Sequence, residues 1–215
     1  MTSLKAQTQA KVEAGRKNNP DFMAGVDKEI ANAKALQQGE SALRIGEKAP
    51  LFTLPSPADD KVSLSDCLSK GPVVLTFYRG SWCPYCNLQL NALKQRMNEI
   101  TALGTTLIAI SPERPDGTLS KEEMSTLPFT VLSDQGADVA ASYGVAWQVP
   151  DFLLEHMRVD RGLDLQEINN GNATILPIPA TFILNKSGEI IWRYVDVDYR
   201  TRSEPDDIIK ALKAL

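Results

Sequence analysis

Two of the three cysteines in this chain lie three residues apart, at Cys83 and Cys86 in the sequence CPYC. They follow Pro72–Tyr78 (PVVLTFY), a β-branched and aromatic run that is typical of a strand buried on both faces. Pro84 suits the first position of a helix, so Cys83 is expected at or next to the N-cap and Cys86 in the first turn. Helix starts and Cys-X-X-Cys motifs lower a cysteine pKa from about 8.5 to roughly 3.5–7.5, which favours the thiolate. The sequence therefore predicts a redox-active pair that closes into a reversible disulfide.

Two other interpretations of the pair are weaker. A zinc site needs about four ligands, and the remaining candidates are Cys67 and the single histidine, His156, neither of which belongs to a second paired motif. No metal and no other cofactor is therefore expected. Two small buried residues would meet at this position only by chance. Cys67 is interpreted as a packing residue, with a third redox thiol as the alternative, and His156 as a surface or loop residue rather than a base.

Composition places the chain among globular proteins. It has 215 residues, 43% of them hydrophobic and 23% charged, with a formal net charge of −4. This charge gives no footprint for nucleic acid or for an anionic membrane surface. No apolar stretch approaches a membrane span, and the polar N-terminus lacks the apolar centre of a secretory signal, so a cytoplasmic protein is expected. In a reducing compartment a close cysteine pair is more often catalytic or metal-binding than structural.

Residues 1–44 are predicted to form an N-terminal helical extension. Asn19 and Pro20 match a cap followed by proline at the first helical position, and the helix should end near Gly39. Four apolar residues then recur at helical spacing, namely Met23, Val26, Ile30 and Ala33. This stripe must cover either the chain's own domain or a second subunit, so a homodimer is one expectation.

Residues 45–215 are predicted to form one α/β domain. Strands are expected at 51–54, 61–63, 72–78, 105–110, 129–132, 181–184 and 189–197, the fifth after a loop rich in charge and proline. Helices are expected at 84–102, 137–143 and 204–214, the last capped by Ser203, with one or two helical turns near 152–157. A parallel βαβ half followed by an antiparallel hairpin, with flanking helices, gives a mixed central sheet. This arrangement is the thioredoxin-like fold.

Several stretches of the domain resemble a known family. They are Ala49–Leu54, Gly71–Tyr78, the Cys83 motif, Ile110–Pro112, Val131–Asp134 and Pro179–Leu184. Together they resemble the peroxiredoxin-like proteins of the alkyl hydroperoxide reductase and thiol-specific antioxidant (AhpC/TSA) superfamily, in the subgroup that carries Cys-x-x-Cys. The resemblance implies an antioxidant peroxidase with a hydroperoxide substrate and a thioredoxin- or glutathione-type reductant.

The family motif and this sequence differ around the cysteines. Peroxiredoxins carry Pro-x-x-x-Thr-x-x-Cys, in which the final cysteine attacks peroxide; on this chain that position is Cys86. Cys83 replaces the threonine, Arg79 replaces the proline, and Pro179 stands where the family has an arginine. The family's threonine and arginine orient and polarise the peroxide bond, so that stabilisation must come from elsewhere or be weaker.

The same differences resemble thioredoxins and glutaredoxins, in which the first cysteine of the pair is the exposed nucleophile. Pro179 directly precedes a predicted strand and is expected to be cis and to face the pair. Trp82, Tyr85, Arg79 and Pro179 are expected to shape the site, with Cys83 the more exposed sulfur and Cys86 shielded by Tyr85 and the Pro179 loop.

Three functions follow from these observations. The first is a thiol peroxidase in which Cys86 attacks and Cys83 resolves. The second is a thiol–disulfide oxidoreductase in which Cys83 attacks and Cys86 resolves. The third is a redox-sensing interaction protein whose disulfide alters the contacts of the N-terminal helix. The first is placed ahead because the resemblance runs through most of the chain.

Overall fold

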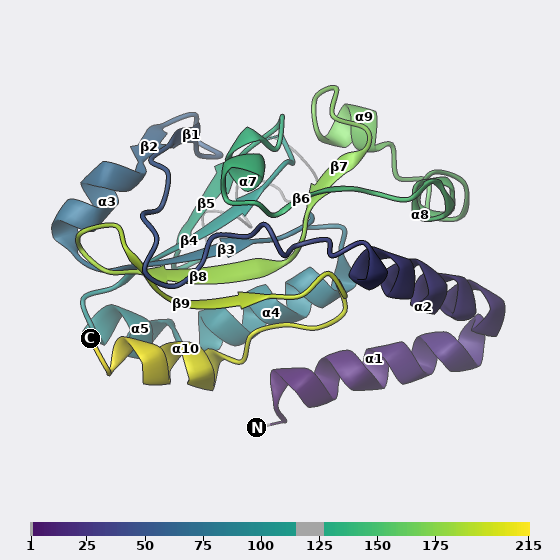
Figure 1. The fold of residues 1–215 in the computed structure, drawn as a ribbon, viewed down its shortest axis with the longest axis horizontal. Coiled ribbons are helices and arrows are strands. Elements are labelled where there is room, and N and C mark those ends of the chain that lie inside the picture. Colours follow the sequence, from purple (N-terminus) through teal and green to yellow (C-terminus); the bar gives the residue numbers. More distant parts are fainter. Residues whose placement is uncertain (1, 115–126) are drawn as a thin grey trace.

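A single mixed sheet forms the centre of the molecule. The structure is a computed structural model that describes residues 2–114 and 127–215. The strand order is β5-β4-β3-β8-β9 (Figure 1). The strands are β3 (Val73–Phe77), β4 (Thr106–Ser111), β5 (Thr130–Ser133), β8 (Ala180–Leu184) and β9 (Ile190–Val195). β3, β4 and β5 are parallel, whereas β8 is antiparallel to both β3 and β9. The predicted mixed sheet, half parallel and half antiparallel, is confirmed.

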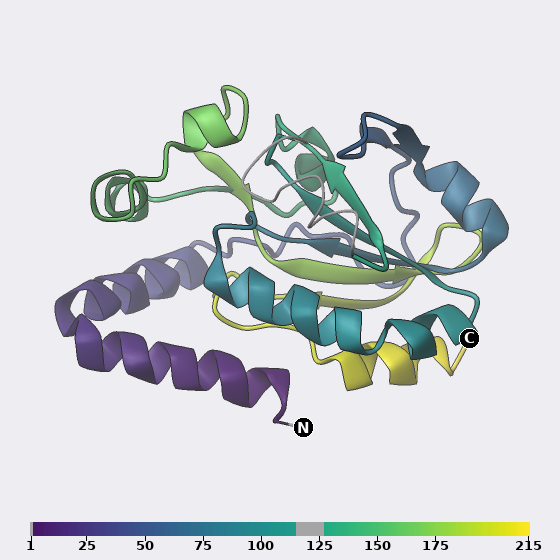
Figure 2. The same cartoon turned by 180° about the vertical axis from the view of Figure 1, so that it is seen from behind.

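The two faces of the sheet bury two separate groups of side chains. Along β3 the side chains alternate, so that Leu75 and Phe77 enter one group and Val74 enters the other. Three helices cover the face of Val74, as both views show (Figures 1 and 2). They are α4 (Pro84–Gln95), α5 (Met97–Ala102) and α10 (Pro205–Leu212). Both cysteines of the pair belong to this second group.

Three helix boundaries differ from the prediction. The helix that begins at Pro20 ends at Ala35 and not near Gly39. The helix expected over 84–102 is divided at Arg96, whose backbone N–H donates to the Leu93 carbonyl in a tighter turn. α10 is capped by Glu204 rather than by Ser203. The Ser203 hydroxyl lies 3.0 Å from the Thr181 hydroxyl inside the protein, so it is engaged with the sheet instead of with the helix.

The N-terminal helices α1 (Leu4–Asn18) and α2 (Pro20–Ala35) form a hairpin at one side of the sheet, with α1 beside α4 (Figure 2). The predicted cap is confirmed, because the Asn19 side chain accepts a hydrogen bond from the Phe22 amide at 3.3 Å. All four residues of the predicted stripe are buried, and Val26 and Ile30 join the core of the sheet. The chain therefore covers this stripe itself. Homodimerisation stays a prediction, and it needs another surface.

Shorter elements surround the sheet. They are β1 (Thr53–Pro55), β2 (Lys61–Ser63), α3 (Leu64–Lys70), α7 (Asp138–Ser142), β6 (Ala146–Gln148), α8 (Asp151–Glu155), a π-helical turn (His156–Asp160), α9 (Leu165–Ile168) and β7 (Ile175–Pro177). The strands expected at 51–54 and 61–63 form β1 and β2, which pair with each other antiparallel. The sequence did not predict α9 or the β6–β7 pair, whose members are three or four residues long and too short for periodicity. Cys67 packs in the core, as expected.

Two further observations concern the whole described chain. Within residues 2–114 and 127–215, every helix is too short or too polar to cross a membrane. Most of the charged, proline-containing loop expected before β5 lies outside the described residues.

The prediction of a cis peptide bond before Pro179 is wrong. All peptide bonds of the described residues are trans. β7 ends at Pro177 and β8 begins at Ala180, so the chain runs on with a short connection and makes no tight turn. Trans is the preferred isomer of an X–Pro bond where no turn demands otherwise. The described residues therefore hold no cis-proline of the thioredoxin type.

Candidate active site

The loop between β3 and α4 places both sulfurs at the start of α4. Cys83 is the N-cap residue, with φ −87° and ψ 113°, and Pro84 is the first helical residue. The Cys83 amide donates to the Gly80 carbonyl at 3.1 Å. Gly80 has a φ of +150°, and a Cβ there would lie 2.3 Å from Nε1 of Trp82, so the loop requires glycine. The predicted position of the pair is confirmed.

The two sulfurs differ in ionisation. Burial alone would raise the pKa of Cys83, but the hydrogen bond from the Cys86 thiol and the positive charges of Arg79 and Arg202 outweigh it and lower this pKa to about 5. Burial and the hydrogen bond to Cys83 raise the pKa of Cys86 well above its ordinary value. At neutral pH, Cys83 is therefore a thiolate and Cys86 is the protonated thiol that donates to it.

The two sulfurs also differ in access, although both are covered. Cys83 is 1% exposed and Cys86 is 0% exposed, so both sulfurs are buried and the expected difference in their surface exposure is very small. Cys83 lines a cavity of about 320 Å³, whereas Cys86 is not among the residues that line it. The cap position would be open in an isolated sheet and helix, but other segments of the chain cover it. Small molecules in the cavity therefore meet Cys83 first.

Arg79 lies beside the thiolate and carries a buried positive charge. It is 4% exposed, and its guanidinium carbon lies 4.1 Å from the centre of the Tyr199 ring and 5.1 Å from that of Trp82. Its Nη2 atom donates to the sulfur of Met157 at 3.8 Å, and its Nε has no hydrogen-bond partner. Among the described residues, no ion pair joins Arg79 to a carboxylate. The thiolate of Cys83 is a negative charge that this cation can offset.

Arg202 holds the second sulfur. It comes from the loop between β9 and α10 and is 6% exposed. Its Nη2 atom donates to Sγ of Cys86 at 3.0 Å, and its Nη1 atom donates to the carbonyls of Tyr199 and Thr201. The hydrogen bonds to these two carbonyls fix the orientation of the guanidinium, so its positive charge stays beside Cys86.

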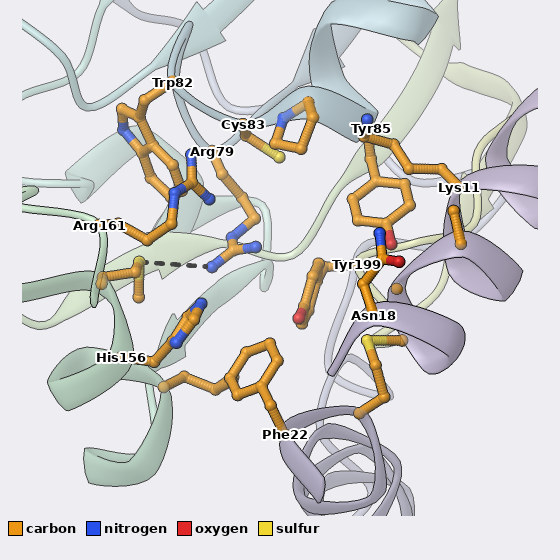
Figure 3. A pocket seen from close by; sticks show the side chains of 16 residues that line it. Lys11, Asn18, Phe22, Arg79, Trp82, Cys83, Tyr85, His156, Arg161 and Tyr199 are labelled. Carbon is orange, nitrogen blue, oxygen red and sulfur yellow. Dashed lines mark hydrogen bonds between the residues drawn. The ribbon is translucent and has the colours of Figure 1, made fainter. Parts of the chain in front are cut away.

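The cavity is enclosed by segments that are distant in sequence (Figure 3). The loop before α4 contributes Trp82 and Cys83, α4 contributes Tyr85, and the N-terminal helices contribute residues that include Lys11 and Phe22. The segment after α8 contributes His156, Met157 and Arg161. The ring of His156 stacks on Phe22 with 3.7 Å between ring centres, and its Nδ1 atom lies 2.6 Å from an Asp160 carboxylate oxygen.

Several of the predicted site residues meet in this cavity, and others do not. Arg79, Trp82, Cys83 and Tyr85 line it. Pro179 is buried but is not among the lining residues, so its predicted place in the site finds no support. His156 also lines the cavity; its side chain is partly exposed, and it lies in the π-helical turn rather than in a loop. A contact across the fold, with Phe22, holds its ring there.

Sequence reasoning missed four further residues, namely Arg202, Tyr199, Met157 and Arg161. The one available signal was Tyr199–Arg202 (YRTR), a basic and aromatic run that follows the last strand. No group of three or more His, Cys, Asp or Glu side chains in the described part of the chain is arranged to hold a metal ion.

Comparisons with known proteins show the family of this chain. The family model described as AhpC/TSA family matches residues 45–193. The chain is 27% identical over 171 residues to Peroxiredoxin Bcp of Escherichia coli, covering 80% of this chain and 96% of that protein.

Solved structures have a similar fold. The crystal structure of Peroxidoxin BcpB from Mycobacterium tuberculosis superposes with a TM-score of 0.61 at 20% identity, over 80% of this chain and 98% of that one. That of peroxiredoxin 6 of Arenicola marina gives a TM-score of 0.60 at 18% identity, over 80% and 72%. The predicted thioredoxin-like fold is confirmed.

Proposed function

From the premise that this chain belongs to the AhpC/TSA family and is a peroxiredoxin-type oxidoreductase, we propose a role for each cysteine of the pair. Cys83 is the thiolate that attacks the hydroperoxide, and Cys86 is the thiol that resolves the product. One observation carries this assignment: Cys83 lines the cavity as a thiolate, and Cys86 lies behind it as a thiol. The family motif instead gives the attack to Cys86. The geometry favours Cys83, because a peroxide in the cavity reaches that sulfur first.

The reaction proceeds in two steps. The Cys83 thiolate attacks one peroxide oxygen, so an S–O bond forms while the O–O bond breaks. The departing oxygen takes a proton from water and leaves as an alcohol, or as water when the substrate is hydrogen peroxide, and Cys83 becomes a sulfenic acid. The Cys86 thiol then attacks the Cys83 sulfur, and the sulfenic oxygen takes the thiol proton and leaves as water. The resulting disulfide is reset by an external thiol.

Two arginines supply the charge that the family obtains from an arginine at the position of Pro179. Arg79 lines the cavity and stabilises the negative charge that develops on the peroxide oxygens as the bond breaks. Arg202 lies 3.0 Å from the Cys86 sulfur and stabilises it as it loses its proton to the departing water. Both charges are buried, where electrostatic stabilisation is stronger than in water.

A thiol–disulfide oxidoreductase is the second candidate. One observation favours it: Cys83, the first cysteine of the pair, has the lowered pKa, which is the order that such enzymes use. Burial opposes it. A protein disulfide must contact the attacking sulfur, and Cys83 is 1% exposed. A hydroperoxide needs only to enter the cavity.

Sulfenic acid trapping separates these assignments. After one equivalent of peroxide, the Cys86→Ser variant should carry a dimedone-type label on Cys83, and the Cys83→Ser variant should neither consume peroxide nor take the label. Cys67→Ser is the control and should react like the parent, because Cys67 belongs to α3, packs in the core and does not line the cavity.

Two results would reverse the proposal. A label on Cys86 in the Cys83→Ser variant would return the attack to Cys86. Reduction of insulin disulfides by a protein that ignores peroxide would favour the oxidoreductase.

A further inference from the structure

We propose that the thiol that reduces the Cys83–Cys86 disulfide is a small molecule bearing carboxylates, of the tripeptide-thiol type, and that Lys11 and Arg161 bind its carboxylates at the cavity rim. This inference rests on the proposed function only in taking the Cys83–Cys86 disulfide as the oxidised form. It differs from a protein reductant, which requires a disulfide at the surface.

Access to the pair is the first argument. The cover over Cys83 includes α1 and α2, which precede the family match at residue 45. This cover is held at several points. The amides of Leu4 and Lys5, at the start of α1, donate to the Glu204 carboxylate at 3.2 and 2.5 Å. Asp27 of α2 pairs with Arg200 at 2.7 Å, beside the loop that carries Arg202. A reductant that reaches Cys83 through this cover must be small enough for the cavity.

The size of the cavity is the second argument. Its volume of about 320 Å³ lies at the lower end of the roughly 300–1,000 Å³ that small-molecule sites occupy. Hydrogen peroxide needs far less room, since a liquid water molecule takes about 30 Å³. The space is suited to a thiol the size of a short peptide, whereas a folded protein does not enter it.

Charge is the third argument. The chain as a whole carries a formal net charge of −4, yet the cavity lining contains Lys11, Arg79 and Arg161 and no Asp or Glu. Among the described residues, no ion pair joins Lys11 or Arg161 to a carboxylate. Asp160 lies beside the lining residue His156, but Asp160 is exposed and is not itself part of the lining. A positive cavity in an acidic protein attracts a small anion.

The two rim cations also suit a ligand with a carboxylate at each end. Figure 3 shows Lys11 on α1 at one side of the cavity and Arg161 at the opposite side, with Cys83 and Arg79 between them. Both side chains belong to exposed residues, so an incoming anion reaches them from solvent. A tripeptide thiol held at both ends places its central sulfur near Cys83.

The reduction balances as two exchanges. One thiolate attacks the Cys83 sulfur, a mixed disulfide forms, and Cys86 leaves as a thiolate beside Arg202. A second thiol gives its proton to Cys86 and attacks the mixed disulfide. The products are the oxidised small thiol, the Cys83 thiolate and the Cys86 thiol.

The test uses the full chain, oxidised to the Cys83–Cys86 disulfide with diamide so that it does not depend on peroxide. Stopped-flow tryptophan fluorescence then compares glutathione, its diethyl ester and thioredoxin as reductants. Glutathione should reduce the disulfide at least about fivefold faster than the ester, which has the same thiol but lacks the carboxylate charges. Thioredoxin at equal concentration should be slower than glutathione. An ester as fast as glutathione, or a faster thioredoxin, would overturn the inference.

Charge variants locate the binding groups. Arg161→Gln and Lys11→Gln should each lower the rate with glutathione by up to about fivefold and leave the rate with the ester unchanged. Arg158→Gln and Lys17→Gln are matched controls on the same segments, outside the lining, and should change neither rate. Equal losses with glutathione and ester would show a structural effect and reject the assignment. If diamide-oxidised protein prefers glutathione but peroxide never oxidises it, the proposed peroxidase fails and the reductant assignment stands.

Discussion

Two regions of the molecule form the cavity beside Cys83. One is the sheet with α4, and the other is a cover of helical segments that closes over the cavity. The sheet and α4 lie within the family match and position the sulfurs, with Cys83 at a helix N-cap. The cover consists of α1, α2 and the segment from α8 to Arg161, and the two N-terminal helices lie outside that match. The first region sets how reactive Cys83 is, and the second sets what reaches it. Variants of each region should therefore change different measurements.

The largest effect should come from Gly80→Ala, which disrupts the region that positions the sulfur. A Cβ at this position would meet the Trp82 ring at 2.3 Å, and the φ of +150° is unfavourable for alanine. We expect a loss of about 2 kcal/mol or more of unfolding free energy and of most peroxide consumption. Thermal or urea unfolding and single-turnover peroxide kinetics measure the two losses.

Gly162→Ala is the matched control for this prediction. Gly162 also has a positive φ, of +61°, but a Cβ there would meet nothing within 4 Å. This variant should lose about 1 kcal/mol from backbone strain alone and should keep its peroxide kinetics. Equal losses in the two variants would show that the Trp82 contact does not matter.

The next effect concerns the ionisation of Cys83. The thiolate is the reactive form, so the peroxide rate should be constant above the Cys83 pKa and fall as pH drops below about 5. Arg79→Gln removes a charge that lowers this pKa, so the pH range over which the peroxide rate falls should move to higher pH. The plateau rate should also fall by about tenfold to a hundredfold, because the same charge stabilises the peroxide oxygens.

A conservative variant separates charge from packing in this prediction. Arg79→Lys keeps the positive charge and should restore the pH range over which the rate falls, although it loses the stacking on Tyr199 and Trp82. Thiolate absorbance near 240 nm against pH gives the Cys83 pKa directly. If the pH dependence of the peroxide rate is the same in Arg79→Gln as in the parent, the hydrogen bond from Cys86 and the charge of Arg202 set the Cys83 pKa without Arg79.

The same division explains what the sequence predicted. The run before Cys83 and the proline after it predicted β3, the start of α4 and the N-cap position of Cys83. These features depend on neighbours in sequence, through burial on both faces of a strand and proline at a helix start. The family resemblance, the mixed sheet and the peroxidase class are likewise confirmed.

The cover and the position of Arg202 beside Cys86 were not predictable in this way, because they depend on contacts between distant segments. Arg202 donates a hydrogen bond to Cys86, which lies 116 residues earlier in the sequence, and the ring of His156 stacks on Phe22. No local sequence pattern predicts either contact. The burial of Cys83 beneath other segments was not predicted for the same reason. The peptide bond before Pro179 was predicted to be cis from an analogy with thioredoxins. The chain there connects two strands without a tight turn, so nothing requires the cis isomer.

The smallest effect should come from Asp27→Asn, which loosens the cover without touching the sulfurs. Asp27 pairs with Arg200 at 2.7 Å and with Arg16 at 3.0 Å, and its side chain is 38% exposed. Because solvent screens such pairs, the variant should lose at most about 1 kcal/mol of unfolding free energy. Peroxide kinetics should be nearly unchanged, whereas alkylation of Cys83 by a bulky maleimide should rise about twofold to threefold, because a small substrate already has access and a large one does not.

The pH dependence of this loss identifies its cause. Burial would raise the pKa of Asp27, but hydrogen bonds from Arg200 and Arg16 outweigh it and hold the pKa below its ordinary value. A carboxyl with a depressed pKa contributes stability above its unfolded value of about 3.9 and loses it as pH falls through the folded value. The difference between parent and variant should therefore be full at pH 6 and shrink below about pH 4. Lys28→Gln, which also removes one charge from α2, should leave both stability and alkylation near those of the parent. If Asp27→Asn accelerates peroxide consumption as much as alkylation, the cover limits the small substrate too, and access and reactivity are not divided between the two regions.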